Sequence, residues 1–505
     1  MIQQIDYFLI APPLALALVA GLVLLLDAFL PARPHTKTVL GAVTLAGMAI
    51  SLGFLVAQAA TQGGRPRSTF CVPPHLDPTR QLCSYVVDRF TLVFAGMVLV
   101  AAVVVVLMSM TELAGGGIPV GEWYFLLLCT LVGAVTLPAS RDLIMLVVAL
   151  ELVSLPVFAL TALKRYDGRS SEAAVKLFVV SVVSTAIMLF GVSLLYGIAG
   201  TVFLSRLAAV LSGQAPAPGL ALTAATGQDL PAVVTVGVVL VVAGFAFKIA
   251  AVPFHAWAAD VYQGAPIPVA ALLSVISKAA GFAGLILILV AALAGQAATW
   301  APIVGILAAL TMTVGNLLAM RQRSAVRLLA WSSVAQSGYI LAPLAVAGSM
   351  AAAVSASMAY LIIYAAMNLG AFAVVMLVSR IAERNELDDY RGLAFRSPAA
   401  GIALAFCLVC LAGLPPGLAG LFAKVFVFRE IVEAGWGWLA LVMAVNTVIG
   451  LYYYVVWTAR LFTPAAGTAP RPRPSTWIAI GLATAVAVLF SIAPQLVLDM
   501  TSFSG

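Results

Sequence analysis

Long apolar runs, separated by short polar connections, follow one another along the whole chain. The hydrocarbon core of a bilayer is about 30 Å thick and a helix rises about 1.5 Å per residue, so about 20 apolar residues can cross it. By this rule the sequence predicts fourteen spanning helices, at residues 8–30, 38–60, 90–110, 122–138, 141–163, 171–199, 232–252, 267–293, 300–320, 324–347, 351–379, 398–428, 435–461 and 475–498. Because these runs are continuous rather than alternating, the expected fold class is an all-α membrane protein and not a barrel.

Composition supports a membrane environment and excludes the soluble classes. Of 505 residues, 63% are hydrophobic and 9% are charged, whereas about a quarter of the residues are charged in an ordinary soluble domain. The net charge of +7 does not indicate nucleic-acid binding, because the basic residues form no dense cluster interleaved with aromatic residues. The first apolar run is too long for a secretory signal and is preceded by no Lys or Arg, so we expect it to remain as a helix.

The basic residues are distributed unevenly between the two sets of connecting loops. If the N-terminus lies outside, fifteen basic residues fall in the inner loops and seven in the outer loops, four of them in or beside the long connection 61–89. An excess of Lys and Arg in short loops marks the cytoplasmic side. Both termini are therefore predicted to face outward. The four remaining basic residues, Lys176, Lys248, Lys278 and Lys424, fall within predicted spans.

Two predicted spans carry backbone breaks beside a lysine. In the seventh, Lys248 precedes Pro253, and in the twelfth, Pro415 and Pro416 precede Lys424. Proline removes an amide donor and clashes with the preceding turn, so each site should kink or unwind its helix. The two spans are five apart, which predicts two inverted five-helix repeats, TM4-8 and TM9-13. The expected division of the chain is 1–121 (TM1-3 and the outer loop), 122–293 and 300–461 (the two halves), and 462–505 (TM14).

Glu151, Lys248, Lys278 and Lys424 lie near the middle of predicted spans or beside the breaks. A charge at the bilayer centre costs about 2.5–3.5 kcal/mol, which requires a partner or a function. Burial favours the neutral amine and a nearby carboxylate favours the ammonium, so a lysine that alternates between these settings can take up and release a proton. We hypothesise that Glu151 pairs with Lys248 and that opening the pair sends a proton toward Lys278 and Lys424. The alternative is static ion pairs that fix helix packing, but three central lysines cannot all pair with one central carboxylate.

Two further residues are weaker candidates for the relay. Lys176 lies nearer the inner end of its predicted span, where its long side chain can reach the interface. His255 follows the seventh-span break by two residues and titrates in the right range, although a packed histidine that bonds freed carbonyls is the alternative. The three histidines are scattered along the sequence, so no imidazole metal site is expected.

The cysteines predict one disulfide and no cofactor site. Cys71 and Cys83 fall in the predicted outer loop, where a disulfide can form. Cys407 and Cys410 show the C-x-x-C spacing but lie in an apolar helix without a second ligand pair, so we interpret them, like Cys129, as packing residues. No Gly-rich phosphate loop, nucleophile elbow or haem-attachment motif occurs, and we expect no cofactor-binding residues and no metal in this chain.

Three long segments carry a resemblance to a known family. They read AGFAFKIAAVPFHAWAADVYQGAPIPVAALLSVISKAAGF (243–282), LDDYRGLAFRSP (387–398) and LAGLPPGLAGLFAKVFVF (411–428). They closely resemble the subunit N family of bacterial NADH-quinone oxidoreductase, respiratory complex I, and the similarity extends over essentially the full length. The related L and M subunits and the Mrp sodium/proton antiporters share the broken helices. The long loop 61–89 and its cysteine pair look like departures from the family pattern.

The resemblance implies a proton-translocating, non-redox subunit of an enzyme, embedded in the bacterial plasma membrane. It implies Glu151 and Lys248 as a coupled pair, Lys278 as the central relay, Lys424 as the second-half site and Lys176 as a family lysine. NADH, FMN, iron–sulfur clusters and quinone would then be held by partner subunits, and the partners would be other membrane subunits, including antiporter-like ones. An Mrp-type sodium/proton antiporter subunit is the alternative function, and a scaffolding subunit whose lysines do not pump is a third.

Overall fold

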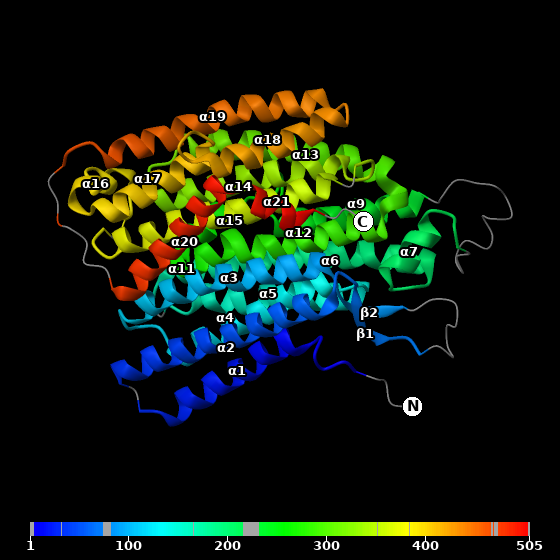
Figure 1. Ribbon diagram of the computed structural model, residues 1–505, viewed down its shortest axis with the longest axis horizontal. Helices are drawn as coiled ribbons and strands as arrows, with labels where there is room; N and C mark the ends of the chain where they lie inside the picture. The colour runs from blue at the N-terminus through cyan, green and yellow to red at the C-terminus, as the bar shows by residue number, and fades with distance from the viewer. Residues whose placement is uncertain are drawn as a thin grey trace.

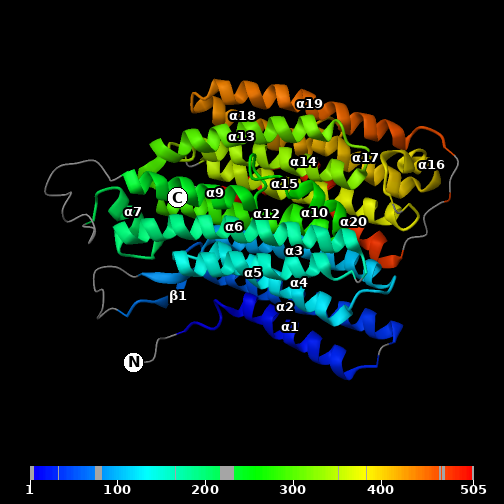
Figure 2. The same ribbon diagram turned by 180° about the vertical axis from the view of Figure 1, so that it is seen from behind.

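The computed structural model describes residues 5–31, 33–73, 82–164, 166–215, 232–350, 352–382, 384–465, 468 and 473–502. Its helices run nearly parallel or antiparallel and form an elongated bundle, with α1 and α2 along one edge and α19 along the opposite edge (Figures 1 and 2). The helices are α1 (Ala11–Phe29), α2 (Pro34–Gln62), α3 (Arg89–Leu113), α4 (Val120–Thr136), α5 (Leu143–Ala162), α6 (Gly168–Ala199), α7 (Leu204–Leu211), α9 (Ala232–Lys248), α10 (Ala258–Gly264), α11 (Ile267–Leu272), α12 (Lys278–Ile286), α13 (Ala297–Ala319), α14 (Ala325–Leu341), α15 (Ala352–Ser379), α16 (Leu393–Arg396), α17 (Pro398–Ala412), α18 (Leu418–Glu433), α19 (Gly437–Leu461), α20 (Pro474–Ile492) and α21 (Gln495–Thr501).

The chain is a multi-pass membrane protein. In the described residues, eleven helical segments are long and apolar enough to cross a bilayer. The predicted spans 232–252, 324–347 and 398–428 appear as shorter helices: α9, α14 continued by a 3-10 turn (Ala342–Val346), and the pair α17 and α18. The first described residues and the end of α21 both lie towards the end of the bundle that carries α7 (Figures 1 and 2).

Polar residues at the ends of the apolar runs start several helices. Asp88, Asp142 and Asp167 each accept a hydrogen bond from a backbone N–H in the first turn of α3, α5 and α6, which satisfies a donor that the helix leaves free. Partial burial would raise the pKa of Asp167, but bonds from the Lys164 ammonium and the N–H of Arg169 hold this pKa below its ordinary value. The caps therefore fix where the apolar run becomes a helix.

A β-hairpin lies between α2 and α3, which the apolar pattern did not predict. Strands β1 (Arg67–Cys71) and β2 (Cys83–Val87) pair antiparallel and are joined by a disulfide between Cys71 and Cys83. The expected all-α class thus describes most of the chain, and this two-stranded sheet is the exception. Its short extended stretches follow the turn signal Gly63–Gly64 rather than a long apolar run.

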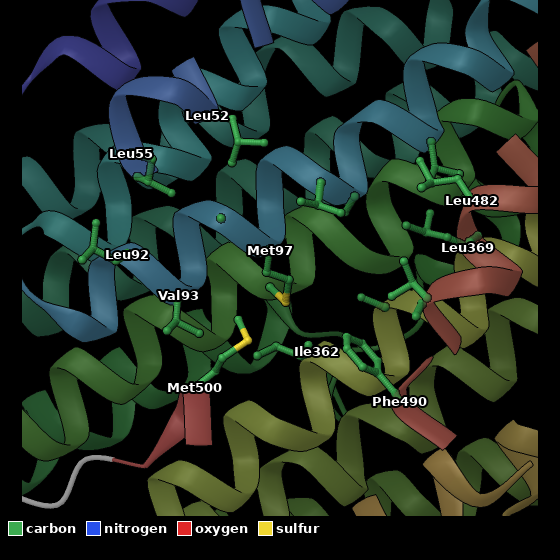
Figure 3. A pocket seen from close by; sticks show the side chains of 18 of the residues that line it. Leu52, Leu55, Leu92, Val93, Met97, Ile362, Leu369, Leu482, Phe490 and Met500 are labelled. Atoms are coloured by element: carbon green, nitrogen blue, oxygen red, sulfur yellow. The ribbon is translucent and has the colours of Figure 1, made fainter. Parts of the chain in front are cut away.

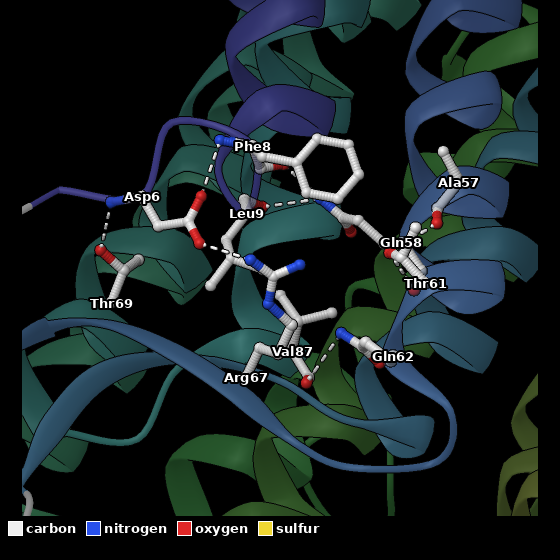
Figure 4. A network of polar contacts seen from close by, with 10 residues as sticks. All are labelled: Asp6, Phe8, Leu9, Ala57, Gln58, Thr61, Gln62, Arg67, Thr69 and Val87. Atoms are coloured by element: carbon white, nitrogen blue, oxygen red, sulfur yellow. Dashed lines mark hydrogen bonds and ion pairs between the residues drawn. The ribbon is translucent and has the colours of Figure 1, made fainter.

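Polar contacts attach the hairpin to the helical bundle (Figure 4). Arg67 forms an ion pair with Asp6 at 2.8 Å, on the segment that precedes α1. The Gln58 side-chain amide donates to the Phe8 and Leu9 carbonyls, and the Gln62 amide donates to the Val87 carbonyl at 3.2 Å. These bonds satisfy backbone groups where α1 and α2 emerge from the bundle.

The helices stop beside the prolines, at the two places where breaks were predicted. After α9 ends at Lys248, residues 249–257 are not helical, and Ala250 adopts a left-handed φ of 56°. Between α17 and α18, Gly413 has a φ of 80°, a conformation that glycine adopts without steric cost. Each break leaves carbonyl groups of the preceding helix without helical partners.

The predicted span 267–293 is not one continuous α-helix. A π-helical turn (Leu273–Ser277) separates α11 from α12, and a second one (Leu287–Ala292) follows α12. Lys278 is the first residue of α12, directly after the first π turn. Such turns widen the helix locally and are frequent at functional sites.

We expect Gly420→Ala to destabilise the contact between α17 and α18. A Cβ atom at Gly420 would overlap the Cys410 carbonyl oxygen, which belongs to backbone and cannot move aside. Overpacking of this kind typically costs about 1–3 kcal/mol. Thermal unfolding of the detergent-purified protein should show a lower melting temperature. Gly481→Ala, in α20, is the control, since nothing lies within 4 Å of the position that its added Cβ would take; equal melting of the two variants would contradict the expectation.

Candidate functional site

Lys248 lies where α5, α6 and α9 meet. Its side chain is buried, with the residue 7% exposed, and its Nζ lies 4.0 Å from Oε1 of Glu151 in α5. The ammonium donates to the hydroxyls of Ser154 in α5 and Ser181 in α6, while Glu151 accepts a 2.8 Å hydrogen bond from Thr185 in α6. The ion pair is therefore long, and both partners have hydroxyls within reach that can replace it.

A small cavity of about 20 Å³ lies beside Lys248. Its lining includes Ser154, Ser181 and Ser277. A cavity of this volume with polar lining can hold about one water molecule. Lys248 lines this cavity together with Ser277, the residue that directly precedes Lys278 in the chain.

Lys278 is buried against α14 and has no carboxylate partner in the described part of the chain. The residue is 1% exposed. Its ammonium donates to the backbone carbonyl of Ser333 and, at 2.8 Å, to the hydroxyl of Ser337. A central cation is thus held by neutral acceptors, which stabilise the charge less than a carboxylate would.

Hydroxyl and amide groups continue from this point along α14 and α15. The Tyr364 hydroxyl donates to Ser333 Oγ at 2.9 Å. Gln336 accepts from the Tyr360 hydroxyl at 2.6 Å, and its amide donates to the Tyr454 hydroxyl at 3.2 Å. These residues were not predicted from the sequence. For Ser333 and Gln336 the signal is the polar stretch WSSVAQSGY (331–339) inside an otherwise apolar run.

Lys424 lies in α18, against the break that precedes this helix. The residue is 8% exposed, and its ammonium donates to the carbonyls of Leu411 and Ala412 at 3.3 and 2.7 Å. These carbonyls belong to the last turn of α17, whose end attracts cations. Nζ also lies 5.5 Å from the ring centroid of Tyr339 in α14, close enough for a cation–π contact. Helix α14 therefore contacts both Lys278 and Lys424.

Lys176 lies apart from the three buried lysines. Its side chain is 44% exposed and forms ion pairs with Glu172 at 2.7 Å and Asp260 at 3.1 Å. Arg327 binds the same Asp260 carboxylate at 2.8 Å. Lys176, Glu172 and Asp260 line a polar cavity of about 330 Å³ next to α10. Asp260 was not predicted from the sequence.

His255 lies in the break between α9 and α10, half-buried, with its ring centroid 5.5 Å from that of Trp331. Its Nδ1 atom is buried without a hydrogen-bond partner among the described residues. Its ring therefore packs on an aromatic neighbour, and no hydrogen bond or ion pair in the described part of the chain joins it to Lys248 or Lys278.

An apolar cavity of about 370 Å³ lies between α2, α3, α15, α20 and α21 (Figure 3). Leu52, Met97, Leu369, Phe490 and Met500 are among its lining side chains, and none of the described residues that line it is polar. Such a surface offers no side-chain donors or acceptors for proton transfer. The buried lysines and their oxygen partners lie outside this cavity.

Comparisons with known proteins identify the family of this chain. The family model described as "NADH:quinone oxidoreductase/Mrp antiporter, TM" matches residues 140–450. NADH-quinone oxidoreductase subunit N 2 of Streptomyces griseus is 48% identical over 528 residues, covering 100% of this chain and 94% of the relative. The chain belongs to the subunit N family of NADH-quinone oxidoreductase.

Further members and solved structures support the same family. Subunit N of Salinispora tropica is 42% identical and covers 99% of both chains. A chain of respiratory complex I from Thermus thermophilus with bound aureothin has a TM-score of 0.75 and 29% identity, covering 98% of this chain and 100% of that one. A chain of the Mrp complex from Dietzia sp. DQ12-45-1b, with a TM-score of 0.78, is 21% identical over 97% of this chain and 96% of its own, which shows a shared fold alone. The range matched by the family model, residues 140–450, includes Glu151, Lys248, Lys278 and Lys424.

Proposed function

We propose that this chain moves protons across the membrane as a subunit of an NADH-quinone oxidoreductase, using Glu151, Lys248, Lys278 and Lys424 as transfer sites. One observation carries the proposal. Of the three buried lysines, only Lys248 has a carboxylate within 4.0 Å among the described residues, and the ammonium groups of Lys278 and Lys424 donate to neutral oxygens. Charges held so weakly inside a membrane are by default functional.

The first step is the opening and closing of the Glu151–Lys248 pair. When the carboxylate approaches, it favours the ammonium form of Lys248, and when it withdraws the buried ammonium loses that support. The Ser154 and Ser181 hydroxyls accept hydrogen bonds from the ammonium when the pair is long. A water molecule in the adjacent cavity would connect Lys248 with the region of Ser277 and Lys278.

The later steps carry the proton from Lys278 to Lys424 past the side chains of α14. Ser333 and Ser337 hold Lys278, and Tyr339 of the same helix faces Lys424. Gln336, Tyr360 and Tyr454 supply donors and acceptors around this helix. In this arrangement the proton passes from one lysine to the next through hydroxyl groups and water; the ammonium that gives it up becomes a neutral amine, and the next proton restores the ammonium.

The setting follows from membership of the family. The chain would act as a non-redox subunit of a translocase in the bacterial plasma membrane. NADH, FMN, iron–sulfur clusters and quinone would be bound by partner subunits, and other membrane subunits, antiporter-like ones included, would flank this chain.

We also propose that this chain has fourteen spans, with TM4-8 and TM9-13 as inverted repeats and both termini outside. The two broken helices and the common direction of the described chain ends support this plan.

The decisive test of the pair is Glu151→Gln. The amide preserves the shape and the hydrogen bond from Thr185 but removes the charge that supports the Lys248 ammonium. NADH-driven proton uptake by inverted membrane vesicles should slow by about tenfold or more, because a positioned acid–base group typically accelerates proton transfer by at least about 100-fold. Glu122→Gln, at an exposed position in the first turn of α4, is the control. Equal uptake in both variants would refute the role of the pair.

A sodium/proton antiporter of the Mrp type is the second candidate, because the matching family model and the fold include such proteins. The two functions differ in the energy source for proton movement, which is NADH oxidation in one and a sodium gradient in the other. Purification of the tagged chain from membranes should recover redox subunits, and proton movement should require NADH and quinone. Movement driven by a sodium gradient in the absence of NADH would favour the antiporter instead.

A further inference from the structure

We propose that Glu430 is an additional proton-transfer site of this chain, between Lys424 and the end of the bundle where α18 turns into α19. The inference rests on the proposed function, since it extends the lysine route by one carboxyl group. Glu430 was not among the residues predicted from the sequence. It lies in α18, six positions after Lys424.

Glu430 is buried and forms no ion pair within 4.0 Å among the described residues. The residue is 8% exposed, and its Oε2 atom is buried without a hydrogen-bond partner among the described residues. The neighbouring Arg429 forms its ion pair with Glu433, to which its Nε donates at 2.7 Å on the exposed side of the helix, and it acts on Glu430 only at longer range. A buried carboxylate without a partner is costly. Such a carboxyl group is therefore either protonated, and so neutral, or retained for a function.

Glu430 and Lys424 lie on the same face of α18. The buried residues of this helix are Ala419, Gly420, Ala423, Lys424, Val427, Glu430 and Ile431. Their spacing of three and four residues forms one stripe along the helix, with Val427 between the two charged groups. Six residues correspond to about 9 Å along the axis, a distance that a proton crosses through bridging water rather than by direct contact.

The position of Glu430 suits the final step of transfer. Helix α18 runs towards the end of the bundle that carries β1, β2 and α7, and Glu430 lies in its last turn (Figures 1 and 2). The ammonium of Lys424 would lose a proton through water to the Glu430 carboxylate, leaving a neutral amine and a carboxylic acid. The acid would then release the proton to water at this end of the molecule. No electrons are transferred in either step.

A carboxyl group at this position would also give the second half of the chain an acidic residue like the one in the first half. In the first half, Glu151 of α5 is the ion-pair partner of Lys248. The α14 helix, which corresponds to α5 in the proposed inverted repeat, contains no Asp or Glu. Glu430 would supply the missing carboxylate from the same helix that carries the lysine.

The test compares Glu430→Gln with Glu433→Gln in the intact enzyme within inverted membrane vesicles. Glu433 is exposed, three residues away, and paired with Arg429, so it controls for the loss of a charge at this helix end. We expect Glu430→Gln to reduce NADH-driven proton uptake several-fold per assembled enzyme, and Glu433→Gln to leave it unchanged. Glu430→Asp, which keeps a carboxyl group, should restore part of the uptake.

Further results would overturn the inference or distinguish it from the proposed function. Normal proton uptake in Glu430→Gln overturns the inference. If uptake by Lys424→Ala in the same vesicles is slow, the proposed function stands without Glu430, and if it is also normal, the proposed function fails as well. Should Glu430→Gln not assemble, Glu430→Met, which removes the buried oxygens, is measured instead. If that variant assembles and pumps normally, or if neither variant assembles, the carboxyl group has a structural role and the inference is wrong.

Discussion

Lys248→Met is expected to abolish most NADH-driven proton uptake while leaving the enzyme assembled. Methionine preserves the length and apolar stem of the side chain but removes the ammonium that lies between Glu151, Ser154 and Ser181. The first acceptor of the route would be lost, and proton uptake should fall by about tenfold or more. The measurement is dye-detected acidification of inverted vesicles, normalised to the amount of assembled enzyme.

The same vesicles provide the controls for Lys248→Met. Electron transfer from NADH to an artificial acceptor, which bypasses quinone and needs only the redox subunits, should be unchanged. Lys37→Met removes another lysine, whose ammonium donates to the Leu113 carbonyl away from the route, and should pump normally. Uptake by Lys248→Met at the level of Lys37→Met would remove Lys248 from the mechanism.

Lys278→Met is expected to stop proton transfer with no loss of stability. The ammonium of Lys278 is buried and has no carboxylate within 4.0 Å in the described residues, and a charge at this depth costs about 2.5–3.5 kcal/mol. Its acceptors remain satisfied in the variant, because the Ser337 hydroxyl also donates to the Ser333 carbonyl at 3.0 Å. Replacing a buried charge by an apolar group of similar size is often neutral or stabilising.

Two measurements on one preparation separate the outcomes for Lys278→Met. The melting temperature of the purified enzyme should equal or exceed that of the unmodified enzyme, whereas proton uptake should fall to the level of Lys248→Met. A structural lysine would behave in the opposite way, with lower melting temperature and retained uptake. That result would show that Lys278 holds α12 and α14 together and does not carry protons.

The apolar pattern predicted much of the fold because the bilayer imposes simple rules. An apolar run long enough to cross the membrane must be helical, whatever its neighbours, since its backbone groups cannot bond to water. Prolines beside Lys248 and Lys424 likewise interrupt their helices for a local reason, the missing amide donor. The β-hairpin followed no such rule, because Arg67–Cys71 and Cys83–Val87 are short strands held by each other and by contacts such as Arg67–Asp6.

The candidate site could be predicted in part. Charged residues are rare inside apolar runs, so Glu151 and the three buried lysines stood out from the sequence alone. Ser181, Ser333 and Gln336 did not, because an isolated serine or glutamine in a spanning helix most often bonds within its own helix. Their role depends on which lysine faces them across a helix interface.

The amino-acid sequence by itself determined that the chain is a multi-pass membrane protein, where its helices break, and which ionisable groups the bilayer must accommodate. These properties depend on single segments and on the free energy of placing each one in lipid. Only the tertiary structure decided that Lys278 is bonded to α14 and not to a carboxylate, that Lys176 pairs with Asp260 at a polar cavity, and that Glu430 is buried without a partner among the described residues. Those facts depend on how helices far apart in the chain pack together, and no local pattern encodes the facing side chain.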